Sequence, residues 1–274
     1  MPGDVDPRYV NARTRLLDAL DALEVHHAGL TLVGAQAVYM RTGPGDLLIT
    51  PFTLDGDLAV DPALLAHEPL IEVAMISGGF TRGDQPGCWL STDFVSIDLL
   101  APASVAGRGR RSVEMPPHDK NSARRTNGLE GALVDRSVEV IVALDPSDTR
   151  THRIGVAGPA ALIVAKAHKL GERVADSSAR DRTRPKDALD IYRLLVAYDA
   201  DVLAESLGRL LADNRSSAAT RQGVVHLEQL FDSRNPVGAE LAAHALAETS
   251  MRNEAMQRSF GLAQELLSRL RTQE

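Results

Sequence analysis

Apolar and polar positions repeat with two different periods along this chain, and the change of period divides it into two parts. Up to about residue 155, several short stretches alternate at every second residue, as β-strands do. Beyond Gly158-Pro159 the apolar positions follow helical spacing almost to the C-terminus. We therefore expect an α/β (α+β) core with a mixed sheet over residues 1–155, followed by an all-α half over residues 156–274.

The same patterns place the individual elements. Leucines at positions 16, 17, 20 and 23 form an apolar stripe, which predicts a helix over residues 11–25. A second helix is expected from Ala35 to the Gly43-Pro44 break, and residues 106–128 lack apolar periodicity and read as a long loop. Strands are predicted at 30–33, 53–60, 70–76, within 88–102, and at 137–144. Further helices are predicted at 160–174, 185–198, 201–213, 223–231, 238–248 and 254–270.

Composition narrows the class of protein. The sequence is 44% hydrophobic and 24% charged, as ordinary globular proteins are. The single cysteine, Cys88, cannot build an internal disulfide or a thiolate metal site, and it fits a reducing, cytoplasmic location. We see no signal peptide and no apolar run of 18 residues, so no membrane association is expected.

Charge is unevenly distributed. The net charge of −7 argues against general nucleic-acid binding, yet residues 107–125 carry six basic and two acidic side chains. A second basic cluster spans Arg180 to Lys186. Both clusters are compatible with a phosphate-bearing partner and equally with solvated surface arginines.

The strand predicted at 53–60 carries Asp55 and Asp57 on one face, because strand side chains repeat every two residues, about 6–7 Å apart. Two carboxylates on one face suit a hard divalent cation, Mg²⁺ or Mn²⁺, held together with substrate phosphates. Asp98, on the strand predicted within 88–102, is the natural third carboxylate. A D-x-D pair alone is weak evidence, since it also occurs by chance.

Other metal and nucleophile sites are poorly supported. The residues after Asp55 lack the glycine that an EF-hand has at its sixth position. Cys88 adjoins Trp89, which favours a packed side chain, and the eight histidines show no metal-binding spacing.

Three further motifs carry chemistry. "LVGAQAVYMR" combines a strand, a turn at Gly34 and a helix start, where backbone N–H groups can hold phosphate. "KAHKLGER" places three basic side chains on one helix face, at Lys166, Lys169 and Arg173. "RPKDALDIY" places Asp187 and Asp190 one turn apart on the next helix.

In this order, the motifs resemble the AbiEii type of nucleotidyltransferase, a toxin group within the polymerase-β-like superfamily that includes the MenT toxins. The resemblance covers roughly Leu30 to Leu195 and implies a nucleotidyltransferase core. It implies catalytic roles for Asp55, Asp57, Asp98, Lys166 and Asp187, with the first three holding the metal. It implies nucleotide binding by Gly34, Ala35, Arg41, Thr53, Lys169, Arg173, Lys186 and Asp190.

One position departs from the family pattern. Ala35 stands where the family usually has a serine whose hydroxyl helps to bind triphosphate. Backbone N–H groups can still hold phosphate at a helix start, so we expect altered nucleotide handling. Asp187 and Asp190 would orient the lysines or contact the nucleotide, and a role of Asp187 as a base stays open.

The resemblance implies an enzyme that transfers NMP from an NTP to RNA, in particular to a tRNA 3′ end, and so acts as a growth-inhibiting toxin with a cognate antitoxin protein. We expect the RNA backbone to contact Arg108, Arg110, Arg111, Lys120, Arg124 and Arg125. Transfer to a protein hydroxyl, a glycosyltransferase that uses D-x-D, and a non-catalytic nucleotide- or RNA-binding protein on the same fold remain alternatives.

Overall fold

A mixed β-sheet forms the centre of the N-terminal part. The computed structural model describes residues 5–43, 52–175, 185–246 and 251–272. The strands are β1 (Leu30–Val33), β2 (Asp55–Val60), β3 (Thr81–Arg82), β4 (Cys88–Leu90), β5 (Ser96–Pro102), β6 (Arg124–Thr126), β7 (Arg136–Val142) and β8 (Thr151–Ala157). Their order is β3-β4-β5-β2-β1-β8-β7, and β6 pairs with the end of β5. The sheet combines parallel pairs (β1/β8, β2/β5, β5/β6) with antiparallel ones, so the predicted mixed sheet is confirmed.

Helices dominate the rest of the chain. The N-terminal part contributes α1 (Pro7–Ala22), α2 (Gly34–Thr42), α3 (Ile71–Ser77) and the 3₁₀ turns η1 (Glu24–Gly29), η2 (Pro62–Leu64) and η3 (Glu130–Leu133). The C-terminal part contributes α4 (Pro159–Ala175), α5 (Pro185–Ala197), α6 (Ala200–Ala212), α7 (Ser217–Leu230), α8 (Val237–His244) and α9 (Arg252–Arg271). Beyond Ala157 the described residues form helices and no strand, which confirms the predicted helical half.

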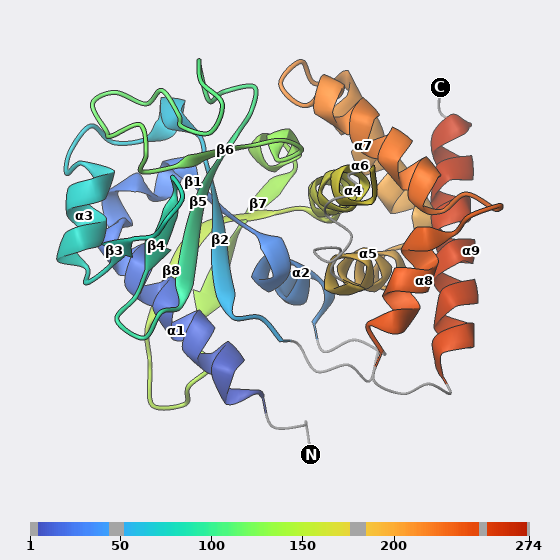
Figure 1. The fold of residues 1–274 in the computed structure, drawn as a ribbon, viewed down its shortest axis with the longest axis horizontal. Helices are drawn as coiled ribbons and strands as arrows, with labels where there is room; N and C mark the ends of the chain where they lie inside the picture. Colours follow the sequence, from blue (N-terminus) through green and yellow to red (C-terminus); the bar gives the residue numbers. More distant parts are fainter. Residues whose placement is uncertain (1–4, 44–51, 176–184, 247–250, 273–274) are drawn as a thin grey trace.

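The elements stack in layers (Figure 1). Helices α1 and α3 lie on one side of the sheet, and α2 lies on the other, between β2 and the pair α4 and α5. Helices α6 to α9 form the outermost layer. One continuous cluster of buried apolar residues includes members of the sheet and of both helical layers. The division of the chain at residues 155 and 156 therefore stays a prediction, although the helices begin at Pro159 as expected.

Local chemistry explains where the first helix begins. The Asp6 side chain accepts a hydrogen bond from the Arg8 N–H at 2.8 Å, and Pro7 occupies the first helical position. This cap starts α1 four residues before the predicted helix. Leu16, Leu17 and Leu20 form its buried face, as the apolar stripe predicted.

Three sequence predictions in this half are wrong or incomplete. Residues 70–76, predicted as a strand, form α3, because Ile71, Ala74 and Met75 bury one helical face at spacings of three and four. The predicted loop at 106–128 contains β6, which pairs in parallel with β5. Strands β3 and β8 were not predicted, although β8 lies inside the sheet between β1 and β7.

No helix in the described ranges combines the length and the apolar character that crossing a bilayer requires.

Candidate functional site

Three carboxylates line one cavity on the face of the sheet that looks toward α4. Strands β2 and β5 run in parallel, and their register sets Asp57 directly beside Asp98 and Asp55 beside Ser96. Asp55, Asp57 and Asp98 all line one cavity of about 450 Å³ between the sheet and α4. The expectation that a neighbouring strand supplies a third acid therefore matches the geometry.

Gly34 makes room for Asp57. It has φ +68°, a backbone conformation that suits glycine, and it begins α2 directly after β1. A Cβ atom at this position would overlap the Asp57 carboxylate. The glycine of the strand–turn–helix motif therefore lets an acidic side chain lie against the first turn of α2.

Asp57 has no hydrogen-bond or ion-pair partner among the described residues. Burial, together with the nearby charge of Asp55, raises the pKa of Asp57 to about 7. An unpaired carboxylate beside two other carboxylates is a site that a cation would neutralise.

Hydrogen bonds from Thr53 and Gln36 hold Asp55 in place. The buried Thr53 hydroxyl donates to Asp55 Oδ1 at 2.5 Å, and the Gln36 side-chain amide donates to the Asp55 carbonyl oxygen at 2.9 Å. Thr53 does not line the cavity. Its contact supports a role in orienting Asp55, and the nucleotide contact implied by the resemblance stays a prediction.

Both carboxylate oxygens of Asp98 already accept hydrogen bonds. Its Oδ2 accepts a hydrogen bond from the Arg124 guanidinium at 2.7 Å, and its Oδ1 accepts one from the Ser96 hydroxyl at 3.0 Å. In the described part of the chain, no three His, Cys, Asp or Glu side chains converge closely enough to hold a metal ion as they stand. The donor chemistry nevertheless fits Mg²⁺ or Mn²⁺, which prefer carboxylate oxygens, and Asp57 lacks another partner. To bind the ion through Oδ2, Asp98 would have to give up its contact with Arg124.

Basic side chains of α4 form the opposite wall. Lys166, Lys169 and Arg173 line the same cavity as the three carboxylates, as their shared helix face requires. The Lys166 ammonium is buried and donates to Asp187 at 2.8 Å and to Asp190 at 2.5 Å, both on α5. Burial alone would lower the pKa of Lys166, but Asp190 and Asp187 outweigh it and raise the pKa.

Asp187 is held by three cations. It accepts from Lys166, pairs with Arg173 at 3.0 Å and lies 3.3 Å from the Lys169 ammonium. Burial alone would raise the pKa of Asp187, but Lys166 and Lys169 outweigh it and hold the pKa below its ordinary value. A carboxylate so engaged is suited to positioning the basic side chains and poorly suited to accepting a proton. Neither Asp187 nor Asp190 lines the cavity.

Three other residues of the implied nucleotide-binding set lie outside the cavity lining. Arg41 donates to the Ala157 carbonyl oxygen at 2.9 Å and pairs with Glu139 at 2.9 Å, so its contacts tie α2 to β7 and β8. Ala35 is buried in the first turn of α2. Lys186 lies 6.0 Å from the centre of the Phe52 ring, and burial lowers its pKa.

The basic segment divides into two groups. Arg124 and Arg125 line the cavity, whereas Arg108, Arg110, Arg111 and Lys120 are exposed and do not line it. The end of the segment joins the sheet through the pairing of β6 with β5, and the Arg125 N–H donates to the Arg111 carbonyl oxygen at 2.8 Å within the segment. Of the second basic cluster, residues 180–184 lie outside the described residues.

Sequence reasoning missed three polar residues of the cavity, Thr126, Asn127 and Glu172. Asn127 follows β6 and donates to Glu172 on α4 at 3.2 Å, so the pair bridges the two walls. Glu172 stands three residues after Lys169 on the same helix face, which is a signal that could have found it. Asn127 carries no such signal, because only the pairing of β6 brings it there.

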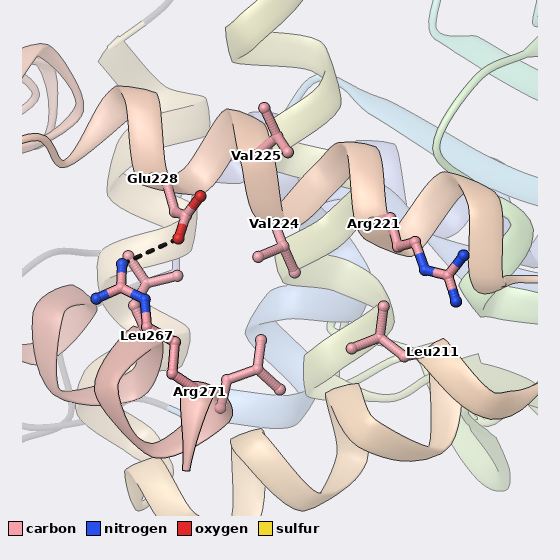
Figure 2. A pocket seen from close by; sticks show the side chains of 8 residues that line it. Leu211, Arg221, Val224, Val225, Glu228, Leu267 and Arg271 are labelled. Atoms are coloured by element: carbon pink, nitrogen blue, oxygen red, sulfur yellow. Dashed lines mark hydrogen bonds and ion pairs between the residues drawn. The ribbon is translucent and has the colours of Figure 1, made fainter. Parts of the chain in front are cut away.

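A second cavity of about 320 Å³ lies between α6, α7 and α9 (Figure 2). Its lining is mainly aliphatic, with Leu211, Val224 and Leu267, and it shares no residue with the carboxylate cavity. Figure 2 shows Glu228 of α7 and Arg271 of α9 paired across it, at 2.9 Å.

Comparison with known proteins gives limited help. No protein-family model and no curated protein matches the sequence. Among solved structures, the chain is similar to the crystal structure of an antigenic nucleotidyltransferase-like protein from Paracoccidioides brasiliensis, with 15% sequence identity and a TM-score of 0.45. The alignment covers 87% of this chain and 93% of that chain. Similarity at this level does not establish a shared activity.

Proposed function

We propose that this chain is a metal-dependent nucleotidyltransferase that transfers NMP from an NTP to an RNA hydroxyl. One observation carries the proposal: a single cavity has carboxylates from β2 and β5 on one wall and basic side chains from α4 on the other. A triphosphate with its divalent cation needs both kinds of wall, because the cation prefers carboxylates and the phosphates prefer Lys and Arg.

Each wall has a distinct task. Asp55, Asp57 and Asp98 would hold Mg²⁺ or Mn²⁺, which when bound neutralises phosphate charge and favours deprotonation of the acceptor hydroxyl. Lys169 and Arg173, with side chains 48% and 27% exposed, can reach phosphate oxygens in the cavity. Lys166 is buried and holds Asp187 and Asp190, so it fixes α5 against α4 and adds positive potential behind the phosphates.

In the transfer, the acceptor oxygen forms a bond to the α-phosphorus while the bond from that phosphorus to the β-phosphate oxygen breaks. The hydroxyl proton leaves to solvent, and pyrophosphate carries away the bonding electron pair. The residues of the cavity orient the triphosphate and neutralise its charge, which is the main protein contribution to phosphoryl transfer.

RNA is the acceptor that the surface charge favours. Arg124 and Arg125 lie in the cavity, and the exposed Arg108, Arg110 and Arg111 belong to the same segment, so positive charge extends from the site onto the surface. By resemblance, the acceptor is the 3′ end of tRNA, the consequence is growth arrest, and the partner is an antitoxin protein.

The test is transfer of label. Purified protein is incubated with Mg²⁺, each α-labelled NTP in turn and total cellular RNA, and the products are separated by size. We expect label in a tRNA-sized band with wild-type protein and none with Asp57→Ala. Asp61→Ala is the matched control, since Asp61 follows the same strand but its side chain caps η2.

Two results would contradict the proposal. Label in protein in place of RNA would identify a protein hydroxyl as the acceptor. Absence of label from RNA and protein with all four nucleotides would indicate a binding protein in which Ala35 marks a lost active site.

A further inference from the structure

A basic side chain, Arg124, lies on the same wall of the cavity as the carboxylates. Arg124 extends from β6, and its guanidinium donates to Asp98 Oδ2 at 2.7 Å and to the Gln85 side-chain oxygen at 3.1 Å. The parallel pairing of β5 with β6 sets Arg124 beside Leu100, two residues beyond Asp98 on the neighbouring strand. Arg124 therefore holds Asp98 Oδ2 at the wall that Asp98 shares with Asp55 and Asp57.

The basic side chains of the opposite wall contact a different carboxylate. Lys166, Lys169 and Arg173 all contact Asp187 on α5. Of the cations in the described cavity lining, Arg124 alone forms an ion pair with one of the three carboxylates. A metal ion at Asp98 Oδ2 would therefore compete with Arg124 for the same oxygen.

The environment of the Arg124–Asp98 pair allows Arg124 to leave Asp98 for another partner. Both side chains remain partly accessible, at 25% and 20%, so the pair is neither locked in the core nor fully solvated. Ion pairs of this kind contribute little net stability, because solvent competes for both partners. An arginine released inside this cavity would meet the phosphates, for which a guanidinium is an excellent donor.

From this geometry we propose that Arg124 is a positioning residue that occupies Asp98 before substrate arrives and turns to the triphosphate when the divalent cation takes Asp98. The inference rests on the proposed function and adds to it a coupling between metal binding and triphosphate binding. Metal alone must displace Arg124 and binds weakly, whereas metal with triphosphate offers Arg124 a new partner. Metal and triphosphate should therefore bind cooperatively, and by linkage each should tighten the other by the same factor.

The test measures Mn²⁺ binding by electron paramagnetic resonance, first with protein alone and then with inorganic tripolyphosphate, which is independent of the base. Arg124→Gln removes the competing charge, so we expect it to bind Mn²⁺ alone about three- to tenfold more tightly than wild type. The same variant should lose most of the cooperativity with tripolyphosphate. Arg124→Lys keeps the charge and should stay near wild type for Mn²⁺ alone.

Arg82→Gln is the matched control, because it removes another arginine–aspartate pair, Arg82 with Asp119 at 3.1 Å, outside the cavity. Its Mn²⁺ affinity should equal that of wild type, and the thermal midpoint of each variant reports whether it is folded. The role of Arg124 is refuted if Arg124→Gln binds Mn²⁺ no more tightly than wild type while wild type binds metal and transfers label. If wild type binds no Mn²⁺ even with tripolyphosphate, the metal site fails and the proposed function fails with it.

Discussion

At the scale of single residues, one glycine decides whether the carboxylate site exists. Gly34 has a positive φ and leaves the space that the Asp57 carboxylate fills. Position 34 therefore needs glycine for two reasons: its backbone has a positive φ, and a side chain would collide with Asp57. The strand–turn–helix motif that resembles the nucleotidyltransferase pattern contains this glycine, and these two reasons explain its presence.

Gly34→Ala should lower the transfer rate about 100-fold while leaving the protein folded. The new methyl group displaces Asp57, and a misplacement of about 1 Å typically costs about 100-fold in rate. The positive φ adds about 1–2 kcal/mol of destabilisation. Labelled transfer and thermal unfolding measure the two effects separately.

Gly79→Ala is the control that separates the effect of backbone strain from the effect of a collision with Asp57. Gly79 also has a positive φ, +86°, but no atom lies within 4 Å of the position its Cβ would take. This control should lose similar stability and keep its activity. Equal loss of transfer in both variants would contradict the assignment of a specific role to Gly34.

At the scale of elements, a buried ion-pair network joins α4 to α5. Helical spacing aligns Lys166, Lys169 and Arg173 on one face of α4, and Asp187 and Asp190 lie one turn apart on α5. One oxygen of Asp190 is buried without a hydrogen-bond partner among the described residues. The network therefore fixes how the two helices pack, at a cost in desolvation that pairing offsets.

This network should make stability sensitive to acid. The pKa of Asp187 is lower in the folded state than its ordinary value of 3.8, so its contribution is complete above about pH 4 and is lost as the pH falls through the folded pKa. Asp187→Asn should lose about 3 kcal/mol at pH 7. Its stability should then fall less steeply than that of wild type between about pH 5 and 2.

Urea unfolding at a series of pH values measures this difference. Asp213→Asn is the control, because it removes an exposed ion pair with Arg215 and should change the acid slope much less. Parallel wild-type and Asp187→Asn curves below pH 5 would show that the folded state does not depress the pKa of Asp187.

At the scale of the whole molecule, charge is separated on an acidic protein. The net charge is −7, yet the segment that enters the cavity through Arg124 and Arg125 also presents Arg108, Arg110 and Arg111 to solvent. An overall negative charge suppresses indiscriminate binding of nucleic acid, and a local basic surface still attracts a phosphate backbone. The expected RNA contact is thus confined to the surroundings of the cavity.

Reversal of the three exposed arginines to glutamate should weaken RNA binding and flatten its salt dependence. Each lost contact with a single-stranded phosphate lowers the slope of log affinity against log salt by about 0.7, so three should lower it by roughly 2. Filter binding or fluorescence anisotropy at increasing salt measures the slope. Reversal of Arg215, Arg221 and Arg234 in the helical half changes the net charge equally and should leave the slope unaltered.

The sequence by itself determined the features that depend on local periodicity. The position of β1 and the shared face of Asp55 and Asp57 follow from a period of two, and the helices from α4 to α9 follow from a period of 3.6. The shared face of Lys166, Lys169 and Arg173 follows for the same reason. These features need only the geometry of the chain over a few neighbouring residues.

Tertiary structure decided the features that depend on pairing between distant segments. Strand β8 and the three-residue β6 exist because β1 and β5 offer them edges, and the short apolar run of α3 became a helix because its buried face packs within the core. The same applies to side-chain partners: Arg41 is tied to β7 and β8, and Arg124 to Asp98. Residue types and spacing showed which charged side chains the chain carries. Only the packing of separate strands and helices decided which of these charges meet, because that depends on contacts between residues far apart in the sequence.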